Sequence, residues 1–442
     1  MLTLRFENNA VIRHDPQYVK YYNGKALVDV PRIEHAELEE KVCSGPVYAL
    51  PNKQPQPTLV TLVLGYECNF SCAYCSQKTM REAGGPIGKP DDFMRLLKAY
   101  PHRFANMRRL MFWGGETLLY WEAITTILDY ILAHRLHART FHAVLITNGS
   151  LLDAEKLRYI KRHPCIRVAL SYDGPTTAES RHIDVLSREH PARDNIIDLY
   201  RFSAAENHAG RKLQLNPLNI AFAETNAHMR RVFKGEVPLV GLNTYFVNGP
   251  NSAASSPYLR DPEGSALRVW EGLRGGHCNS YFGLYALRGC HYLRAARQRY
   301  DFLDTYENTA EVSPAHRIRI NLQGDITAFH AGNFTPGYMF GNIADMDDPA
   351  KLVFPHKGIF TKDKRDTCAN CPVLTFCQTG DPFVTDPDMM QANCRSRFIQ
   401  FFPVWLYLLH DLFNARLAAV EGDFHMRPLC DALLDAVRSS SL

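Results

Sequence analysis

The chain has no apolar run long enough to cross a membrane, and its N-terminal segment, MLTLRFENNAVIRHDP, lacks the apolar stretch of a secretory signal peptide. We therefore expect a cytoplasmic protein without membrane contact. Excess charge is also scarce, because the formal net charge is only +4 over 442 residues. Such a balance does not call for nucleic acid or an anionic membrane as partner.

Cysteine, by contrast, is plentiful. The chain has 12 cysteines, and several stand at short, regular spacings. Without an export signal, this pattern favours metal binding over disulfides. The length and an apolar fraction of 46% predict a globular protein with two or three domains.

One loop places Cys68, Cys72 and Cys75 in a C-x3-C-x2-C arrangement. Cysteine thiolates select zinc, copper(I) or iron–sulfur clusters. A structural zinc site needs a fourth ligand nearby, and this loop offers none. A cubane held by three cysteines would leave one iron open to a cofactor or substrate.

From Thr58 onward, strand-like and helix-like segments alternate. We predict strands at 58–64, 109–113, 143–147, 166–171, 215–222 and 243–247, and helices at 91–100, 118–134, 153–162 and 194–206. Strands separated by helices imply parallel βα units that close into a partial barrel. In such barrels the chemistry lies where strands end.

Three of the predicted strands end in small polar motifs. The second ends in Gly114-Gly115-Glu116, the third in a Thr-Asn-Gly turn that contains Asn148, and the fourth in Ser171-Tyr172-Asp173-Gly174-Pro175. Each motif alone is typical of a turn. Together with the cysteine loop, they mark one edge of the barrel.

In this order, CNFSCAYC, WGGE, TNG and SYDGP resemble the core of the radical S-adenosylmethionine (SAM) superfamily, over roughly residues 58–226. The branch with a C-terminal SPASM domain is the most similar. The resemblance implies that Cys68, Cys72 and Cys75 ligate a [4Fe–4S] cluster. Its open iron would bind the amino and carboxylate groups of SAM.

The resemblance also assigns SAM contacts. Tyr74 would lie near the adenine, and Glu116 would meet the amino group together with Gly114 and Gly115. Thr117 stands where the family usually has proline. The remaining residues implied at the cofactor are Asn148, Ser171 and Asp173, the last two near the ribose, and Arg181 as a carboxylate partner.

A second cysteine set follows a predicted hairpin at 318–329. Its members, in the pattern C-x2-C-x5-C plus a later cysteine, are Cys368, Cys371, Cys377 and Cys394. Four thiolates can close a site completely. The region resembles a SPASM domain, whose complete form binds two auxiliary clusters through seven cysteines.

Here the set is incomplete. Phe329 and Asp381 stand where that domain has cysteines, and 313–316 has none. We therefore predict one auxiliary [4Fe–4S] cluster, which would relay electrons or staple the small domain. An alternative rebuilds the missing site from Cys278 and Cys290 with Asp381 or His330. Against it, the two cysteines are interpreted as buried thiols.

The flanking regions complete the expected layout. Residues 1–56 would be a cap on the barrel, or a platform whose strand edge pairs with an extended peptide. The expected order continues with a barrel at 57–255, a helical linker at 256–312, a SPASM-like domain at 313–397 and C-terminal helices at 398–442. A connecting loop is expected at 248–262, and helices at 266–273 and 281–299. The aromatic residues near 398–405 are interpreted as core packing. Residues expected to be structural only are Cys43, Cys165, Cys430, His14, His35, His228 and His425.

The expected fold class is thus α/β, a partial (β/α)6 TIM-like barrel followed by a small iron–sulfur domain. The resemblance implies an enzyme that reductively cleaves SAM and modifies a ribosomal precursor peptide, with flavodoxin or ferredoxin as reductant. A cyclophane or ether crosslink is favoured, and thioether formation or epimerisation stays open. Two rivals are an anaerobic sulfatase-maturing enzyme and a non-catalytic iron–sulfur or zinc scaffold. The strand-end motifs argue against the scaffold.

Overall fold

The computed structural model describes most of the predicted barrel and parts of both termini. The described residues are 1–15, 20–23, 26–27, 57–75, 77–78, 81, 87–205, 213–215, 222–234, 250–275, 317–327, 339–348, 351, 368, 370–377 and 386–440. Several predictions fall outside these ranges: the strand at 243–247, the helix at 281–299, and residues His35, Cys43, Cys278, Cys290, Phe329, His330 and Asp381.

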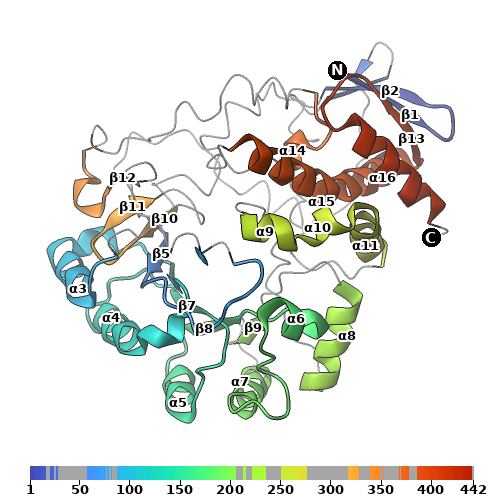
Figure 1. The fold of residues 1–442 in the computed structure, drawn as a ribbon. Coiled ribbons are helices and arrows are strands. Elements are labelled where there is room, and N and C mark those ends of the chain that lie inside the picture. Colours follow the sequence, from blue (N-terminus) through green and yellow to red (C-terminus); the bar gives the residue numbers. More distant parts are fainter. Residues whose placement is uncertain are drawn as a thin grey trace.

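The centre of the molecule is an eight-stranded sheet in the order β12-β11-β10-β5-β6-β7-β8-β9 (Figure 1). Strands β5 to β9 run parallel to their neighbours, which confirms the predicted α/β class. Their bounds are β5 (Leu59–Val63), β6 (Arg109–Trp113), β7 (His142–Thr147), β8 (Ile166–Leu170) and β9 (Leu213–Leu215). The intervening helices are α3 (Pro90–Ala99), α4 (Trp121–Ala133), α5 (Ala154–Arg162) and α7 (Arg193–Ala205).

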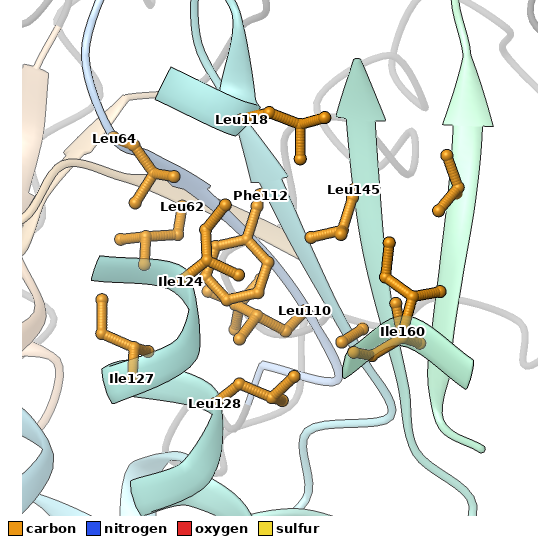
Figure 2. Packing of buried hydrophobic residues seen from close by; sticks show 14 of the residues in the cluster. Leu62, Leu64, Leu110, Phe112, Leu118, Ile124, Ile127, Leu128, Leu145 and Ile160 are labelled. Carbon is orange, nitrogen blue, oxygen red and sulfur yellow. The ribbon is translucent and has the colours of Figure 1, made fainter. Parts of the chain in front are cut away.

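Strand alternation divides this sheet into two faces. On β6, Leu110 and Phe112 are fully buried and pack in one core with Ile124, Ile127 and Leu128 of α4 (Figure 2). Successive residues of a strand point to opposite faces, so Arg109, Met111 and Trp113 occupy the other side. We call this second side the inner face. Because the helices cover one face of the sheet, functional residues are expected on the inner face and at the strand ends.

The predicted hairpin is present and belongs to the same sheet. Strands β10 (Arg317–Ile320) and β11 (Asp325–Thr327) pair antiparallel, and Gly324 in their turn has a φ of +85° that favours glycine. Strand β10 also pairs parallel with β5, and β12 (Met339–Asn342) pairs with β11. The hairpin expected in a separate small domain thus extends the barrel sheet, a pairing that sequence reasoning did not predict.

The N-terminal strands form a second sheet with a strand from the other end of the chain. Its order is β13-β1-β2-β3-β4, with β1 (Leu2–Phe6), β2 (Val11–Asp15), β3 (Lys20–Asn23), β4 (Ala26–Leu27) and β13 (Leu417–Glu421). Leu2 and Leu4 share a core with α15 (Pro387–Phe413) and α16 (Arg427–Ser439). The described N-terminal strands therefore pack on the C-terminal helices. The role expected for 1–56, a cap on the barrel or a peptide platform, stays a prediction.

Strand β13 also corrects the prediction that 398–442 is entirely helical. Leu417 and Val420 are buried, and the strand pairs antiparallel with β1. Its partner strand β1 lies more than 400 residues away in sequence, so a local sequence pattern does not predict this pairing. The aromatic stripe of α15 is core as predicted, because Phe398, Phe402 and Trp405 are buried.

Two further predictions differ from the structure at positions where helices begin. The expected loop at 248–262 contains α9 (Pro250–Ser255) and α10 (Pro257–Arg260), followed by α11 (Pro262–Arg274). Each begins with proline, which suits a first helical turn as well as a loop. The expected strand at 215–222 is described only at its two ends, where β9 ends at Leu215 and α8 (Phe222–Phe233) begins at Phe222, and 216–221 lie outside the described residues.

None of the described helices is both long and apolar enough to span a membrane.

Candidate cluster and cofactor site

The first cysteine loop follows β5 at the carboxyl end of the parallel strands, the edge at which β6, β7 and β8 also end. Backbone hydrogen bonds fasten it to the end of β6. The N–H of Gly115 donates to the Gly65 carbonyl over 3.0 Å, and the N–H of Glu116 donates to the Glu67 carbonyl over 2.8 Å. The start of the loop is therefore held against the segment that follows β6.

Gly114 and Gly115 make this close approach feasible. A Cβ on Gly115 would lie 2.0 Å from the Glu67 carbonyl oxygen, and a Cβ on Gly114 would lie 2.3 Å from that of Gly65. Gly114 also has a φ of +155°. The family resemblance implied that these glycines meet the cofactor, and the structure shows that they lie against the cysteine loop. Their contact with SAM stays a prediction.

We expect Gly115→Ala to lower the free energy of unfolding by about 1–3 kcal/mol, because the new methyl group forces two backbone segments apart. Gly275→Ala is the matched control, since Gly275 is an exposed helix-end glycine with a φ of −75°. Its effect should stay within about 0.5 kcal/mol. Chemical denaturation of both variants makes the comparison. Equal midpoints for the two would contradict the packing role.

Glu116 is buried at the same edge, with 1% of its surface exposed. One carboxylate oxygen, Oε1, accepts from the Leu118 N–H and the Thr147 hydroxyl. The other, Oε2, accepts from the Asn148 N–H over 2.7 Å. Burial raises the pKa of this carboxyl group, while those three hydrogen bonds act in the opposite direction. A buried carboxylate with neutral donors around it is suited to receive an ammonium group.

The position after Glu116 is Thr117, where the family usually has proline, and its contacts show what the threonine contributes. It begins the 3-10 helix η2 (Thr117–Tyr120) and is fully buried. Its hydroxyl donates to the Ile146 carbonyl on β7. Threonine thus adds a hydrogen bond between β7 and the segment after β6.

The Asn148 turn is tied directly to the cysteine loop. The Asn148 side-chain amide donates to Asn69 Oδ1 over 2.9 Å, and the Asn69 amide donates to the Ser150 hydroxyl over 2.8 Å. Ser150 in turn donates to Asn148 Oδ1. This closed ring of hydrogen bonds fixes the loop against β7. Asn69, between the first two cysteines, was not identified from the sequence.

Asp173 and Arg181 form a buried ion pair below the loop. Asp173 is 0% exposed and Arg181 is 5% exposed. The guanidinium donates to both carboxylate oxygens, over 2.9 and 3.1 Å. Asp173 Oδ2 also accepts from the hydroxyls of Tyr74 and Ser180, each over 2.7 Å. This arrangement links α6 (Thr177–Arg181) to the cysteine loop.

Tyr74 is the residue through which the pair holds the loop. Its ring lies 5.4 Å from the Arg181 guanidinium carbon, and burial raises the pKa of its hydroxyl well above the usual value. The neighbouring Ala73 N–H donates to the Ser180 carbonyl, and the Ser255 hydroxyl of α9 donates to the Ala73 carbonyl. Asp173 and Arg181, predicted to meet the ribose and carboxylate of SAM, are thus engaged with each other and with Tyr74.

Ser171 lies at the end of β8, where its N–H donates to the Thr147 carbonyl over 2.8 Å. It therefore shares the strand edge with Glu116 and Asn148.

The three loop thiols are partly exposed and lie close enough for their charges to interact. Burial raises the pKa of the Cys72 thiol to about 11; Arg181 lowers it, while Cys75 and Cys68 raise it. Burial also raises the pKa of Cys68, whose sulfur accepts from the Phe70 N–H over 3.4 Å. Three neighbouring thiols beside a cation match the donor set of a soft cluster.

Within the described ranges, no three His, Cys, Asp or Glu side chains are arranged to surround a single metal ion. A cubane is larger than one ion, so its thiolates stand further apart. The loop thiols fit that larger group by the chemistry of their donor atoms.

Comparison with known proteins identifies the stretch of chain that contains these residues. Residues 62–198, which include the cysteine loop, Glu116, Asn148, Asp173 and Arg181, match the Radical SAM superfamily. This part of the chain is a radical SAM domain. A curated relative is the radical SAM cyclopropyl synthase TigE of Paramaledivibacter caminithermalis, 24% identical over 169 residues. The match covers 35% of this chain and 33% of that protein, so the chain spans about a third of this relative's length.

Two solved structures share the fold over a longer part of this chain than the radical SAM domain. Histidine-tagged anSMEcpe with bound AdoMet has a TM-score of 0.52 and 14% identity, covering 81% of this chain and 100% of that chain. Native anSMEcpe with bound AdoMet and Cp18Cys peptide has a TM-score of 0.51 and 14% identity, covering 81% and 99%. These likenesses show the fold.

Outside the radical SAM domain, the structure brings the second cysteine set together. Burial raises the pKa of the Cys371 thiol well above its usual value, and Cys394, Cys377 and Cys368 each raise it further. The N–H of Cys371 donates to the Cys368 carbonyl over 2.9 Å, in a tight turn. Cys377 ends α14 (Leu374–Cys377), and Cys394 lies on α15. All four predicted ligands are thus neighbours.

His425 stands beside this set. Its Nε2 lies 2.8 Å from Cys394 Sγ. Sequence spacing had given no reason to connect His425 with a cysteine 31 residues away. Two other histidines that were expected to be structural have contacts of that kind: His228 bonds to the Tyr172 hydroxyl over 3.0 Å, and buried His14 packs against the Trp405 ring. Cys430 is buried in the C-terminal core, as predicted.

Proposed function

We propose that this protein is a radical SAM maturase that acts on a ribosomally made precursor peptide. A [4Fe–4S] cluster and SAM, when bound, supply the one-electron chemistry that releases a 5′-deoxyadenosyl radical and removes hydrogen from a substrate C–H bond. The observation that carries the proposal is the convergence of Cys68, Cys72 and Cys75 with buried Glu116 at one strand edge of a radical SAM domain.

The residues of this chain have separate roles in the proposal. The three loop thiols hold the cluster, and the Glu116 carboxylate receives the amino group of SAM. Asn148 and Ser171 line the same strand edge and face the cofactor. Asp173 and Arg181 act on the loop through Tyr74, which sets where the cofactor's adenine lies.

A peptide substrate is supported by the fold neighbour anSMEcpe, which was solved with AdoMet and a Cp18Cys peptide. The related TigE is named a radical SAM cyclopropyl synthase, which supports the radical SAM chemistry. For the product we favour a cyclophane C–C or ether crosslink. A thioether is less favoured, because the proximal auxiliary site that could bind a substrate thiol lacks its usual cysteines.

For the second set we propose one auxiliary [4Fe–4S] cluster on Cys368, Cys371, Cys377 and Cys394. Their mutual proximity in a buried setting supports it. A cytoplasmic flavodoxin or ferredoxin would supply the electron.

The proposed function is tested by anaerobic reconstitution with iron and sulfide, followed by SAM and dithionite. We expect 5′-deoxyadenosine to form, and methionine with it in equal amount, because one SAM yields one of each. Omitting dithionite is the control and should give neither. A fully reconstituted protein that makes no 5′-deoxyadenosine would favour the non-catalytic scaffold instead.

A further inference from the structure

We propose that Arg109, His142 and Arg167 bind a carboxylate-bearing segment of the substrate peptide on the inner face of the barrel sheet. We call these three residues the inner basic cluster. The inference rests on the proposed function, which it deepens by naming an acidic peptide as the substrate class.

Strand register places the cluster on one face. Leu110, Ala143 and Val168 are buried in the core beneath the helices. The residues that precede them on β6, β7 and β8 therefore point to the inner face. Arg109 is paired with His142 in the parallel ladder, and Val144, which shares the face of His142, is paired with Arg167. Three adjacent strands thus present three basic side chains together.

Two of these side chains are in contact, and the charge of the third acts on both. An Arg167 guanidinium nitrogen lies 2.9 Å from His142 Nε2. Burial lowers the pKa of His142, with Arg167 and Arg109 adding to the effect, and burial followed by Arg109 lowers that of Arg167. Among the described residues, every charge that shifts these two groups is positive. The like charges of Arg109 and Arg167, held close enough to affect each other, gain from an anion between them.

The inner-face positions of the described strands β5 to β8 carry no carboxylate. Apart from the cluster they are apolar or neutral, for example Thr61, Met111 and Val144. The cluster is also reachable, because Arg109 is exposed and His142 and Arg167 are partly exposed. Two guanidinium groups suit a carboxylate, which accepts paired hydrogen bonds from each planar fork.

The position of the cluster makes the proposal specific. Arg109 begins β6 and Trp113 ends it, next to the segment that fastens the cysteine loop. At about 3.3 Å per residue, the two ends lie about 13 Å apart. A peptide carboxylate on the inner basic cluster would therefore stand about four extended residues from the strand edge where the cofactor site lies. The modified residue and the recognised Asp or Glu should show that spacing.

The test uses reconstituted full-length protein with SAM and two fluorescein-labelled probes, a short oligoglutamate peptide and the matching oligoglutamine peptide. Fluorescence anisotropy should show the glutamate probe binding at least about tenfold more tightly. Arg167→Gln should weaken that binding about tenfold or more, and the loss should shrink at high ionic strength. The control is Arg158→Gln on α5, an exposed arginine of the helix layer, which should bind as wild type does.

The proposal is overturned if both probes bind equally, or if Arg158→Gln weakens binding as much as Arg167→Gln. Displacement of the glutamate probe by equimolar inorganic phosphate would assign the cluster to phosphate and overturn it as well. Should Arg167→Gln fail to fold, exposed Arg109→Gln gives the same comparison. SAM cleavage by the wild-type preparation is measured alongside. Its absence would reject the proposed function whatever the anisotropy shows.

Discussion

Replacing Cys68, Cys72 and Cys75 together by alanine is expected to abolish 5′-deoxyadenosine formation while leaving about one cubane of iron in the protein. The loop thiols are the proposed ligands of the cluster that reduces SAM, so their loss removes the electron donor to the cofactor. The second cysteine set lies outside the radical SAM domain, in another hydrophobic core, and should keep its own cluster.

Iron and sulfide analysis of the variant gives the count, and chromatography of the SAM reaction gives the activity. Cys165→Ala is the control, because Cys165 lies beyond both cysteine sets and should retain activity. About two cubanes in the triple variant would show that a proximal auxiliary site survives, and that its missing cysteines are replaced by other ligands. Undiminished 5′-deoxyadenosine would refute the assignment of the loop.

Asp173→Ala is expected to lower the free energy of unfolding by about 3–5 kcal/mol, because it leaves the Arg181 guanidinium buried without its carboxylate. The Tyr74 and Ser180 hydroxyls lose their acceptor at the same time. The cysteine loop should therefore become less ordered. We expect weaker SAM binding in addition to lower stability.

Chemical denaturation measures the first effect and equilibrium dialysis of SAM the second. The control is Asp198→Ala, which breaks the surface pair with Lys161 and should cost no more than about 1 kcal/mol. Adding Arg181→Met to Asp173→Ala should recover part of the lost stability, since no buried charge is then left unpaired. If the double variant is less stable than Asp173→Ala alone, the unpaired guanidinium is not the cause.

Much of the barrel was readable from local sequence. The strand predicted at 109–113 matches β6, and the helix predicted at 153–162 differs by one residue, because Asp153 is its N-cap and accepts from the Lys156 N–H. Hydrophobic alternation and capping chemistry are local, so they survive without tertiary information. The aromatic stripe of α15 was recognised for the same reason.

Three of the failures share one cause. Strand β13, the β10–β5 pairing and the His425–Cys394 contact all join residues distant in sequence, and no local pattern contains such a partner. The prolines at 250 and 257 misled in another way, because the same residue type serves loops and first helical turns.

The sequence by itself determined the kind of chemistry, since three closely spaced cysteines and the Gly-Gly-Glu, Thr-Asn-Gly and Ser-Tyr-Asp-Gly motifs specify donors and turns by residue type alone. Only the tertiary structure decided which groups those donors meet. It turned Asp173 and Arg181 toward each other and Tyr74, packed Gly115 against the cysteine loop, and gathered Arg109, His142 and Arg167 on one face. The reason is geometric: the strand edge and the inner face bring together side chains that the chain itself keeps tens of residues apart.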